Sequence, residues 1–191
     1  MYMFLRMYIV HRTSNSLHMN AKINKIIKVN QPIDTVWNLI IDPEKIVSCV
    51  PGASLTSKES DTDYKGQVEF KLGPVKAKYD GQVTFLSRDS ASHKMSLKGV
   101  GLESKGKGNA EMIMDADLSE VAEGGTAINL SMDVSISGMM AQFGSRLIND
   151  VTGQLLDQFG KNLEAKLVGG EVDKDVHTGS IIGSVVKGLF K

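Results

Sequence analysis

The stretch from Met139 to Leu167, MMAQFGSRLINDVTGQLLDQFGKNLEAKL, decides the fold. Its large apolar side chains recur at steps of three and four residues, which is the spacing of one face of an α-helix. These residues are Met140, Phe143, Leu147, Val151, Leu155, Phe159 and Leu163. Polar residues such as Asp150, Asp157 and Glu164 take the opposite side. The pattern predicts one long amphipathic helix that needs an apolar surface against its apolar face.

The residues before this helix alternate with a period of two, which is typical of half-buried β-strands. From Ser54 to Ile136, apolar and small residues alternate with polar ones in successive runs. Turn-forming residues separate the runs, among them Gly73-Pro74, Lys105-Gly106 and Glu123-Gly124-Gly125. A series of hairpins with one apolar face predicts an antiparallel sheet that is covered on one side only.

The chain before Ser54 supplies the remaining elements. Ala21 to Val29 alternates as a strand, and Pro32 stands where the first turn of a helix tolerates proline. Apolar residues at helical spacing follow up to Ile41, and Asp42-Pro43 then ends that helix and starts a second short one. This order of elements predicts an α+β protein with a helix-grip fold. In that fold a curved antiparallel sheet wraps around the long C-terminal helix, and two short helices follow the first strand.

The chain divides into four parts. Residues 1–18 are expected to be a disordered leader or a misassigned start, because Arg6 interrupts their apolar run and no cleavage site follows. Residues 19–168 form the ligand-binding domain. Residues 169–180 are polar without a period and predict a flexible linker. Residues 181–191 form an amphipathic segment that binds a membrane surface, a partner or its own domain. Its apolar side chains are Ile181, Ile182, Val185, Val186, Leu189 and Phe190.

Composition excludes several classes of function. The chain has 191 residues, of which 41% are hydrophobic, and this suits one folded domain with tails. Its formal net charge is +0, so a nucleic-acid partner is not expected. A single cysteine excludes an intramolecular disulfide, and no apolar run reaches the roughly 20 residues that a membrane-spanning helix requires.

Residues with catalytic chemistry are sparse and scattered. The histidines do not pair with other metal-ligating residues at useful spacing, so no metal site is expected. Cys49 stands between apolar neighbours without a visible base, which favours a packed thiol over a nucleophile. Asp42 and Glu44 are predicted to cap and polarise the short helix after Pro43. The sequence therefore predicts a protein that is not an enzyme and has no catalytic residues.

The inner face of the sheet combines methionines with small residues, including Gly66, Gly81 and Gly99. Flexible thioethers adapt to irregular apolar shapes, and small residues leave space, so a cavity for an apolar ligand is predicted, with a merely soft core as the alternative. Gln142 or Arg146 is expected to contact a polar headgroup; a carboxylate on the sheet rim is the alternative partner for Arg146. The residues predicted to line the cavity are Trp37, Phe70, Tyr79, Phe85, Met112, Met132, Phe143, Leu147 and Val151.

Three motifs resemble one known family. They are Asp42-Pro43-Glu44 with Cys49-Val50-Pro51-Gly52, then Lys71-Leu72-Gly73-Pro74-Val75, then Gly138-Met-Met-Ala-Gln-Phe-Gly144 followed by Arg146. Together the motifs resemble the carbon monoxide dehydrogenase CoxG family of the START-like (SRPBCC) superfamily.

The resemblance implies a helix-grip fold that binds an isoprenoid quinone or a lipid, with no covalent or metal cofactor. It also implies a molybdenum-containing dehydrogenase as partner, and a cytoplasmic location at the inner face of the cell membrane. The alternative is an assembly or membrane-docking factor for that dehydrogenase without a bound ligand. Some START-like proteins are cyclases or hydrolases, which is the third alternative.

Overall fold

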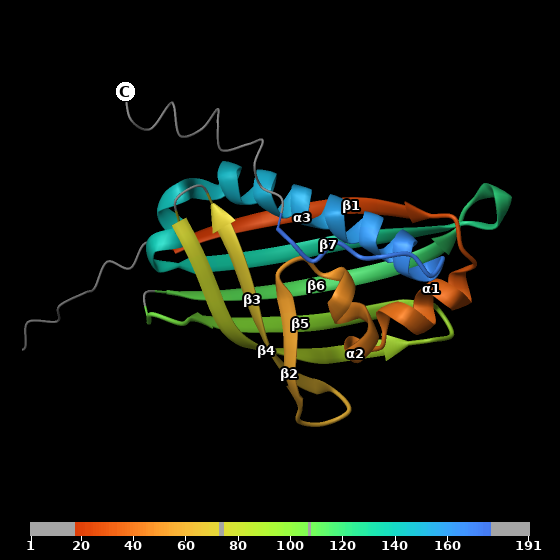
Figure 1. The fold of residues 1–191 in the computed structure, drawn as a ribbon, viewed down its shortest axis with the longest axis horizontal. Coiled ribbons are helices and arrows are strands. Elements are labelled where there is room, and N and C mark those ends of the chain that lie inside the picture. Colours follow the sequence, from red (N-terminus) through yellow and green to blue (C-terminus); the bar gives the residue numbers. More distant parts are fainter. Residues whose placement is uncertain (1–17, 73–74, 107, 177–191) are drawn as a thin grey trace, which may run out of the picture.

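The computed structural model describes residues 18–72, 75–106 and 108–176 and has its elements in the predicted order (Figure 1). The strands are β1 (His18–Val29), β2 (Ala53–Lys58), β3 (Asp63–Leu72), β4 (Val75–Asp89), β5 (Lys94–Glu103), β6 (Asn109–Glu120) and β7 (Thr126–Ser137). The α-helices are α1 (Ile33–Ile40), α2 (Pro43–Ile46) and α3 (Gly144–Leu167). Short 3-10 helices are η1 (Val47–Cys49), η2 (Ala122–Gly124) and η3 (Gly138–Phe143).

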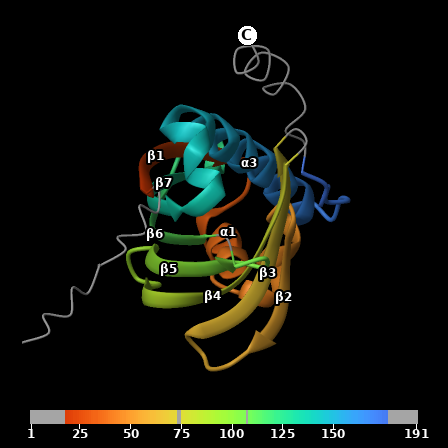
Figure 2. The same cartoon turned by 90° about the vertical axis from the view of Figure 1, so that its left-hand side faces the viewer.

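The strands form one 7-stranded antiparallel sheet with the order β1-β7-β6-β5-β4-β3-β2. Strands β2 to β7 are a meander, and β1 joins the free edge of β7. Figure 2 shows that the sheet curls around the space in front of α1, with α3 along one side. The predicted α+β helix-grip fold is therefore confirmed.

Glycines allow the sheet to curve at one row of paired positions. Gly66 on β3 pairs with Gly81 on β4, which pairs with Gly101 on β5. A Cβ atom on Gly66 would lie 2.6 Å from the carbonyl oxygen of Ser54, and one on Gly81 would collide with the carbonyl oxygen of Val100. Any side chain at these two positions would force the neighbouring strands apart, so their glycines permit the bend.

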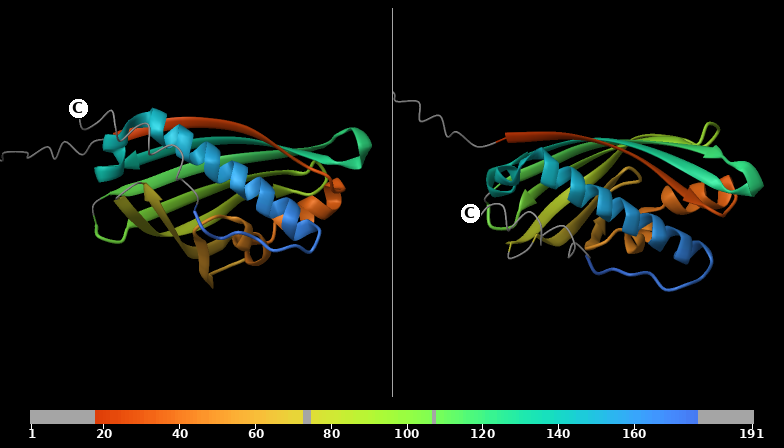
Figure 3. Two further views of the ribbon diagram at one scale, coloured as in Figure 1. Left: turned by 45° about the horizontal axis from the view of Figure 1, so that its top comes forward. Right: turned by 90° about the horizontal axis from the view of Figure 1, so that it is seen from above.

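Helix α3 lies along β1, as the two views in Figure 3 show. Gly160 permits this approach, because a Cβ atom there would lie 2.9 Å from Cγ2 of Ile27. On the outer side, the Asp157 carboxylate pairs with Lys25 Nζ at 2.7 Å, and the Glu164 carboxylate accepts from the Asn30 N–H at 3.0 Å. The helix is thus fixed to the edge strand of the sheet.

The start of α3 differs from the prediction that the helix begins at Met139. Residues Gly138 to Phe143 form η3, and the α-helix begins at Gly144. Gly138 and Gly144 have φ angles of 78° and 75°, which side chains other than hydrogen rarely adopt. The two glycines turn the chain sharply, so the predicted single helix is broken into two pieces.

Two apolar clusters fill the interior at opposite ends of α3. The closed-end cluster gathers around α1 and includes Val36, Trp37, Ile128 and Leu163. The η3-end cluster gathers around η3 and the first half of α3. Its buried members are Met19, Ala21, Ile23, Ala77, Tyr79, Met132, Ile136, Met140, Ala141, Leu147, Ile148 and Val151.

The first part of the predicted flexible linker is not free of the domain. Asn162, buried on α3, accepts from the Asp173 N–H at 2.9 Å and donates to the Asp173 carbonyl at 2.6 Å. The Gly52 N–H donates to the carbonyl of Lys174 at 3.0 Å. Residues 171–176 therefore run back against α3 and the start of β2. The lack of periodicity in the sequence concealed this, because the chain is held through its backbone groups.

The predicted cap of α2 is present. The Asp42 carboxylate accepts from the N–H groups of Glu44 and Lys45 at 3.1 and 3.3 Å. Its second oxygen lies 2.8 Å from Lys45 Nζ, and this contact is the largest cause of the lowered pKa of Asp42. Asp42 thus fixes the turn that separates α1 from α2.

Candidate ligand-binding site

Between α3 and the inner face of β3 to β6, apolar side chains remain only half-buried. They are Val68, Phe70, Val83, Met112, Met114, Leu155, Leu156 and Phe159, termed here the interior site. In a close-packed core, side chains with a sheet on one side and a helix on the other lose nearly all exposed surface. The interior site is therefore incompletely filled.

The interior site lies between the two clusters. Met112, Met114 and Leu156 pack against members of both clusters. On β5, a Cβ atom at Gly99 would meet only the Met112 side chain, with its nearest atom 3.1 Å away, and one at Gly101 would meet only Tyr79. Glycine and flexible methionine side chains thus occupy the middle of the inner face, where large rigid groups would otherwise stand.

The structure is nearly closed at this site. The pocket at its η3 end has a volume of about 10 Å³, which is room for about one water molecule. A larger hollow, of about 730 Å³, lies on the outer face of the sheet. That hollow is open and lined by polar groups such as Asn24, Ser96 and Asn129. An apolar ligand fits the inner face better by chemistry, and its entry requires side chains there to move.

The predicted cavity residues divide between the two ends. Trp37 and Phe85 belong to the closed-end cluster, where Trp37 Nε1 donates to Ser90 Oγ at 3.1 Å and the Phe85 ring packs edge-on against Tyr64. Met112 lies between the clusters. The remaining six are together at the η3 end: Phe70, Tyr79, Met132, Phe143, Leu147 and Val151. Contact between these residues and a ligand remains a prediction.

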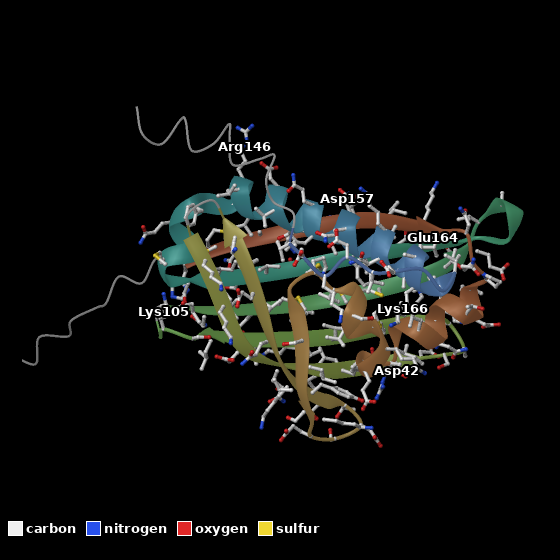
Figure 4. All side chains as sticks on the ribbon, in the orientation of Figure 1. Asp42, Lys105, Arg146, Asp157, Glu164 and Lys166 are labelled. Carbon is white, nitrogen blue, oxygen red and sulfur yellow. The ribbon has the colours of Figure 1, made fainter. Side chains whose placement is uncertain are left out.

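The structure does not bring the predicted headgroup contacts to the interior site. Gln142 and Arg146 are both exposed, and Arg146 points away from the sheet in Figure 4. Helical periodicity explains this placement, because Arg146 directly precedes the buried pair Leu147 and Ile148 and so falls on the outer side of α3. The residues of the tail, 181–191, lie outside the described residues.

A buried polar group at the η3 end was not predicted. Glu103 is the register partner of Tyr79 and is itself buried, and it accepts from the Lys105 N–H at 3.2 Å. Alternation along β5 was the available signal, because Met95, Leu97, Gly99, Gly101 and Glu103 share the inner face. Burial first, and then the nearby charge of Glu103, raise the pKa of Tyr79.

The reactive groups of the described residues have structural surroundings. Cys49 is buried with its Sγ 3.8 Å from the carbonyl oxygen of Asn162, and burial raises the pKa of its thiol. Within residues 18–72, 75–106 and 108–176, no group of three His, Cys, Asp or Glu side chains is placed to hold a metal ion. None of the helices in these ranges is both long and apolar enough to cross a bilayer.

A curved sheet that grips a C-terminal helix over an apolar interior site defines a START-like (SRPBCC) protein. The chain belongs to the CoxG family, which is named for a subunit of carbon monoxide dehydrogenase and whose family model matches residues 26–168. No curated protein matches the chain significantly.

Solved structures share the fold. A conserved protein from Geobacillus kaustophilus is 22% identical with a TM-score of 0.70, over 79% of this chain and 96% of that chain. The Zhui aromatase/cyclase from Streptomyces sp. R1128 is 11% identical with a TM-score of 0.55, over 80% and 99%. Norcoclaurine synthase from Thalictrum flavum is 13% identical with a TM-score of 0.51, over 76% and 87%. At these identities the likeness shows the fold alone.

Proposed function

We propose that the protein binds an isoprenoid quinone or a similar lipid at the interior site and carries it without catalysing a reaction. The observation that carries this proposal is the incomplete burial of apolar side chains between α3 and the inner face of the sheet. A bound ligand would remove that surface from water. Each apolar side chain that becomes fully buried contributes about 1.5–3 kcal/mol.

Family membership supports the partner part of the proposal. The CoxG family takes its name from carbon monoxide dehydrogenase, so the partner is a dehydrogenase of the molybdenum-containing type. The chain would link that enzyme to the inner face of the cell membrane through residues 181–191. Loss of liposome co-sedimentation after removal of this segment, with the fold retained, is the expected result; unchanged co-sedimentation would exclude it as the anchor.

The case against catalysis rests on the character of the interior site. Its half-buried residues are apolar, and the only cysteine is enclosed with a raised pKa. Tyr79 and Glu103 are the ionisable groups at its η3 end, and burial keeps the Tyr79 hydroxyl protonated. Binding therefore explains the site better than acid–base chemistry.

An assembly or docking factor without a ligand is the second candidate, and exposed aliphatic side chains favour it. Ile26, Val100, Leu102 and Ile113 stand on the outer face of the sheet, and Leu102 is 68% exposed. A surface of this kind would contact a partner protein directly. This function would need the outer face and would not depend on the interior site.

One substitution separates the two candidates. Gly99→Leu places a side chain where only the flexible Met112 side chain lies close, so it fills the interior site without a backbone collision. The carrier hypothesis predicts at least a tenfold weaker Kd for decylubiquinone, on the order of the 1.4 kcal/mol that one lost contact represents. Partner capture in a pull-down should be unchanged.

Gly153→Ala is the matched control. A Cβ atom at Gly153, within α3, meets nothing within 4 Å, so ligand binding should stay at the wild-type value. Unchanged decylubiquinone binding in Gly99→Leu would contradict a ligand at the interior site. Loss of partner capture in the same variant, with the fold retained, would favour the docking factor.

A further inference from the structure

The small pocket at the η3 end of the interior site has a polar side. Tyr79, Glu103 and Ser137 line it together with Met139 and Met140. All three polar residues are at least nine-tenths buried, although they stand beside the apolar η3-end cluster. Buried polar groups normally have hydrogen-bond partners, so the partner of each group indicates what the pocket can bind.

Two of the three groups are already engaged. Ser137 Oγ accepts from the Asn109 N–H at 3.0 Å and also contacts the Asn109 side chain. The Glu103 carboxylate accepts from the Lys105 N–H at 3.2 Å. These contacts fix the ends of β5, β6 and β7 around the pocket.

The Tyr79 hydroxyl is different. None of the hydrogen bonds among the described residues involves it. Within the same residues, the fully enclosed side-chain oxygen or nitrogen without a partner is Gln154 Oε1 and not Tyr79 Oη. The Tyr79 oxygen therefore touches open space, and the pocket that Tyr79 lines provides that space.

The hydroxyl is held as a hydrogen-bond donor in a fixed position. The Tyr79 ring stacks on Phe70 with 6.1 Å between centroids and 10° between planes, and Gly101 leaves room for its edge. Burial and the neighbouring Glu103 raise its pKa, so the oxygen keeps its proton at neutral pH. A fixed donor in an apolar setting suits an acceptor oxygen that a ligand brings with it.

We propose that the Tyr79 hydroxyl donates a hydrogen bond to the oxygen of a carbonyl-headed apolar ligand, such as a quinone, at the η3 end of the interior site. The apolar chain of the ligand then runs along Met112 and Leu155 towards the closed end. This inference rests on the proposed carrier function. A head larger than one water molecule enters when Met139 and Met140 move, which flexible thioethers allow and the 38% exposure of Met139 favours.

The test compares two probes that differ in the head. Decylubiquinone carries carbonyl oxygens, and n-decylbenzene has the same chain length on a ring without oxygen. Isothermal titration calorimetry gives Kd for both with the full-length chain and with Tyr79→Phe. The expected result is a Kd for decylubiquinone about tenfold weaker in the variant, with the decylbenzene Kd unchanged.

Tyr64→Phe is the matched control. Tyr64 is also buried, but it belongs to the closed-end cluster and its hydroxyl donates to the carbonyl oxygen of Asp61 at 3.3 Å. Its loss should leave both Kd values unchanged. Circular dichroism of each variant checks that the fold is retained, and a conservative tyrosine-to-phenylalanine change keeps the ring packing.

The outcomes are distinct. Equal weakening of both probes by Tyr79→Phe, or no weakening of either, overturns the headgroup contact while the carrier function stands. Wild-type protein that binds decylbenzene as tightly as decylubiquinone also overturns it. Failure of wild-type protein to bind either probe would instead refute the carrier function and this inference with it.

Discussion

The two ends of the interior differ in how completely they are packed. At the closed end, α1, α3 and the sheet bury Val36 and Leu163 completely. At the η3 end, Phe70 and Phe143 stay half-buried, and methionines from β7 and η3 provide much of the contact. A rigid end maintains the fold, whereas a softer end can admit a ligand at small cost, because few close contacts must be broken there.

The largest expected effect is a contrast between core truncations. Leu163→Ala removes a fully buried side chain at the closed end and should lower the free energy of unfolding by about 4 kcal/mol. Met112→Ala in the half-buried interior site should cost only about 1–2 kcal/mol. Urea denaturation followed by circular dichroism measures both. Equal losses would mean that the two regions are packed alike.

A smaller effect is expected at the segment 171–176. Asn162→Ala removes the side chain that holds Asp173 and the carbonyl oxygen of Cys49, the latter at 3.1 Å, and should cost about 2 kcal/mol. Hydrogen exchange should rise in residues 171–176. Exchange at the wild-type rate would show that the segment is held by other contacts, such as that between Gly52 and Lys174.

The smallest effect concerns pH and the closed end. Asp63 accepts hydrogen bonds from Thr84, Thr62 and Ser60, and these lower its pKa from 3.8 to about 2. A lowered pKa stabilises the fold at any pH above the unfolded value, and the contribution is lost as pH falls from about 3.8 to about 2. Asp63→Asn should therefore show a flatter decline in stability over this window.

Thermal unfolding in buffers between pH 5 and pH 2 makes that comparison. Lys22 and Asp133 form an exposed pair at 3.0 Å on the outer face and supply the control. Asp133→Asn should leave the slope close to wild type, because exposed ion pairs contribute little. If Asp63→Asn declined as steeply as wild type, the hydrogen bonds around Asp63 would not be responsible.

Sequence periodicity predicted most of the fold for a physical reason. Strands and helices bury one face each, so alternation before Ser137 and three- and four-residue steps after Gly144 identified every major layer. The break at η3 was missed, because Met139 and Met140 fit a helical stripe while the positive φ angles of Gly138 and Gly144 are not visible in hydrophobicity. The docking of residues 171–176 was missed because backbone groups hold it.

The candidate site was predicted in part. Alternation identified the inner face of each strand, which is why Phe70, Tyr79 and Met132 fall in one cluster. It did not indicate which inner positions are closely packed, so Trp37 and Phe85 were grouped with them although they belong to the closed end. The distance between elements along α3 decides this, and a single sequence does not contain it.

The most direct test is organic extraction of the full-length protein, purified without detergent from cells that contain quinone, followed by mass spectrometry. We expect an isoprenoid quinone or a single lipid class close to one molecule per chain, and much less in Gly99→Leu protein prepared in parallel. An extract without such a molecule, or equal amounts from both proteins, would contradict a ligand at the interior site.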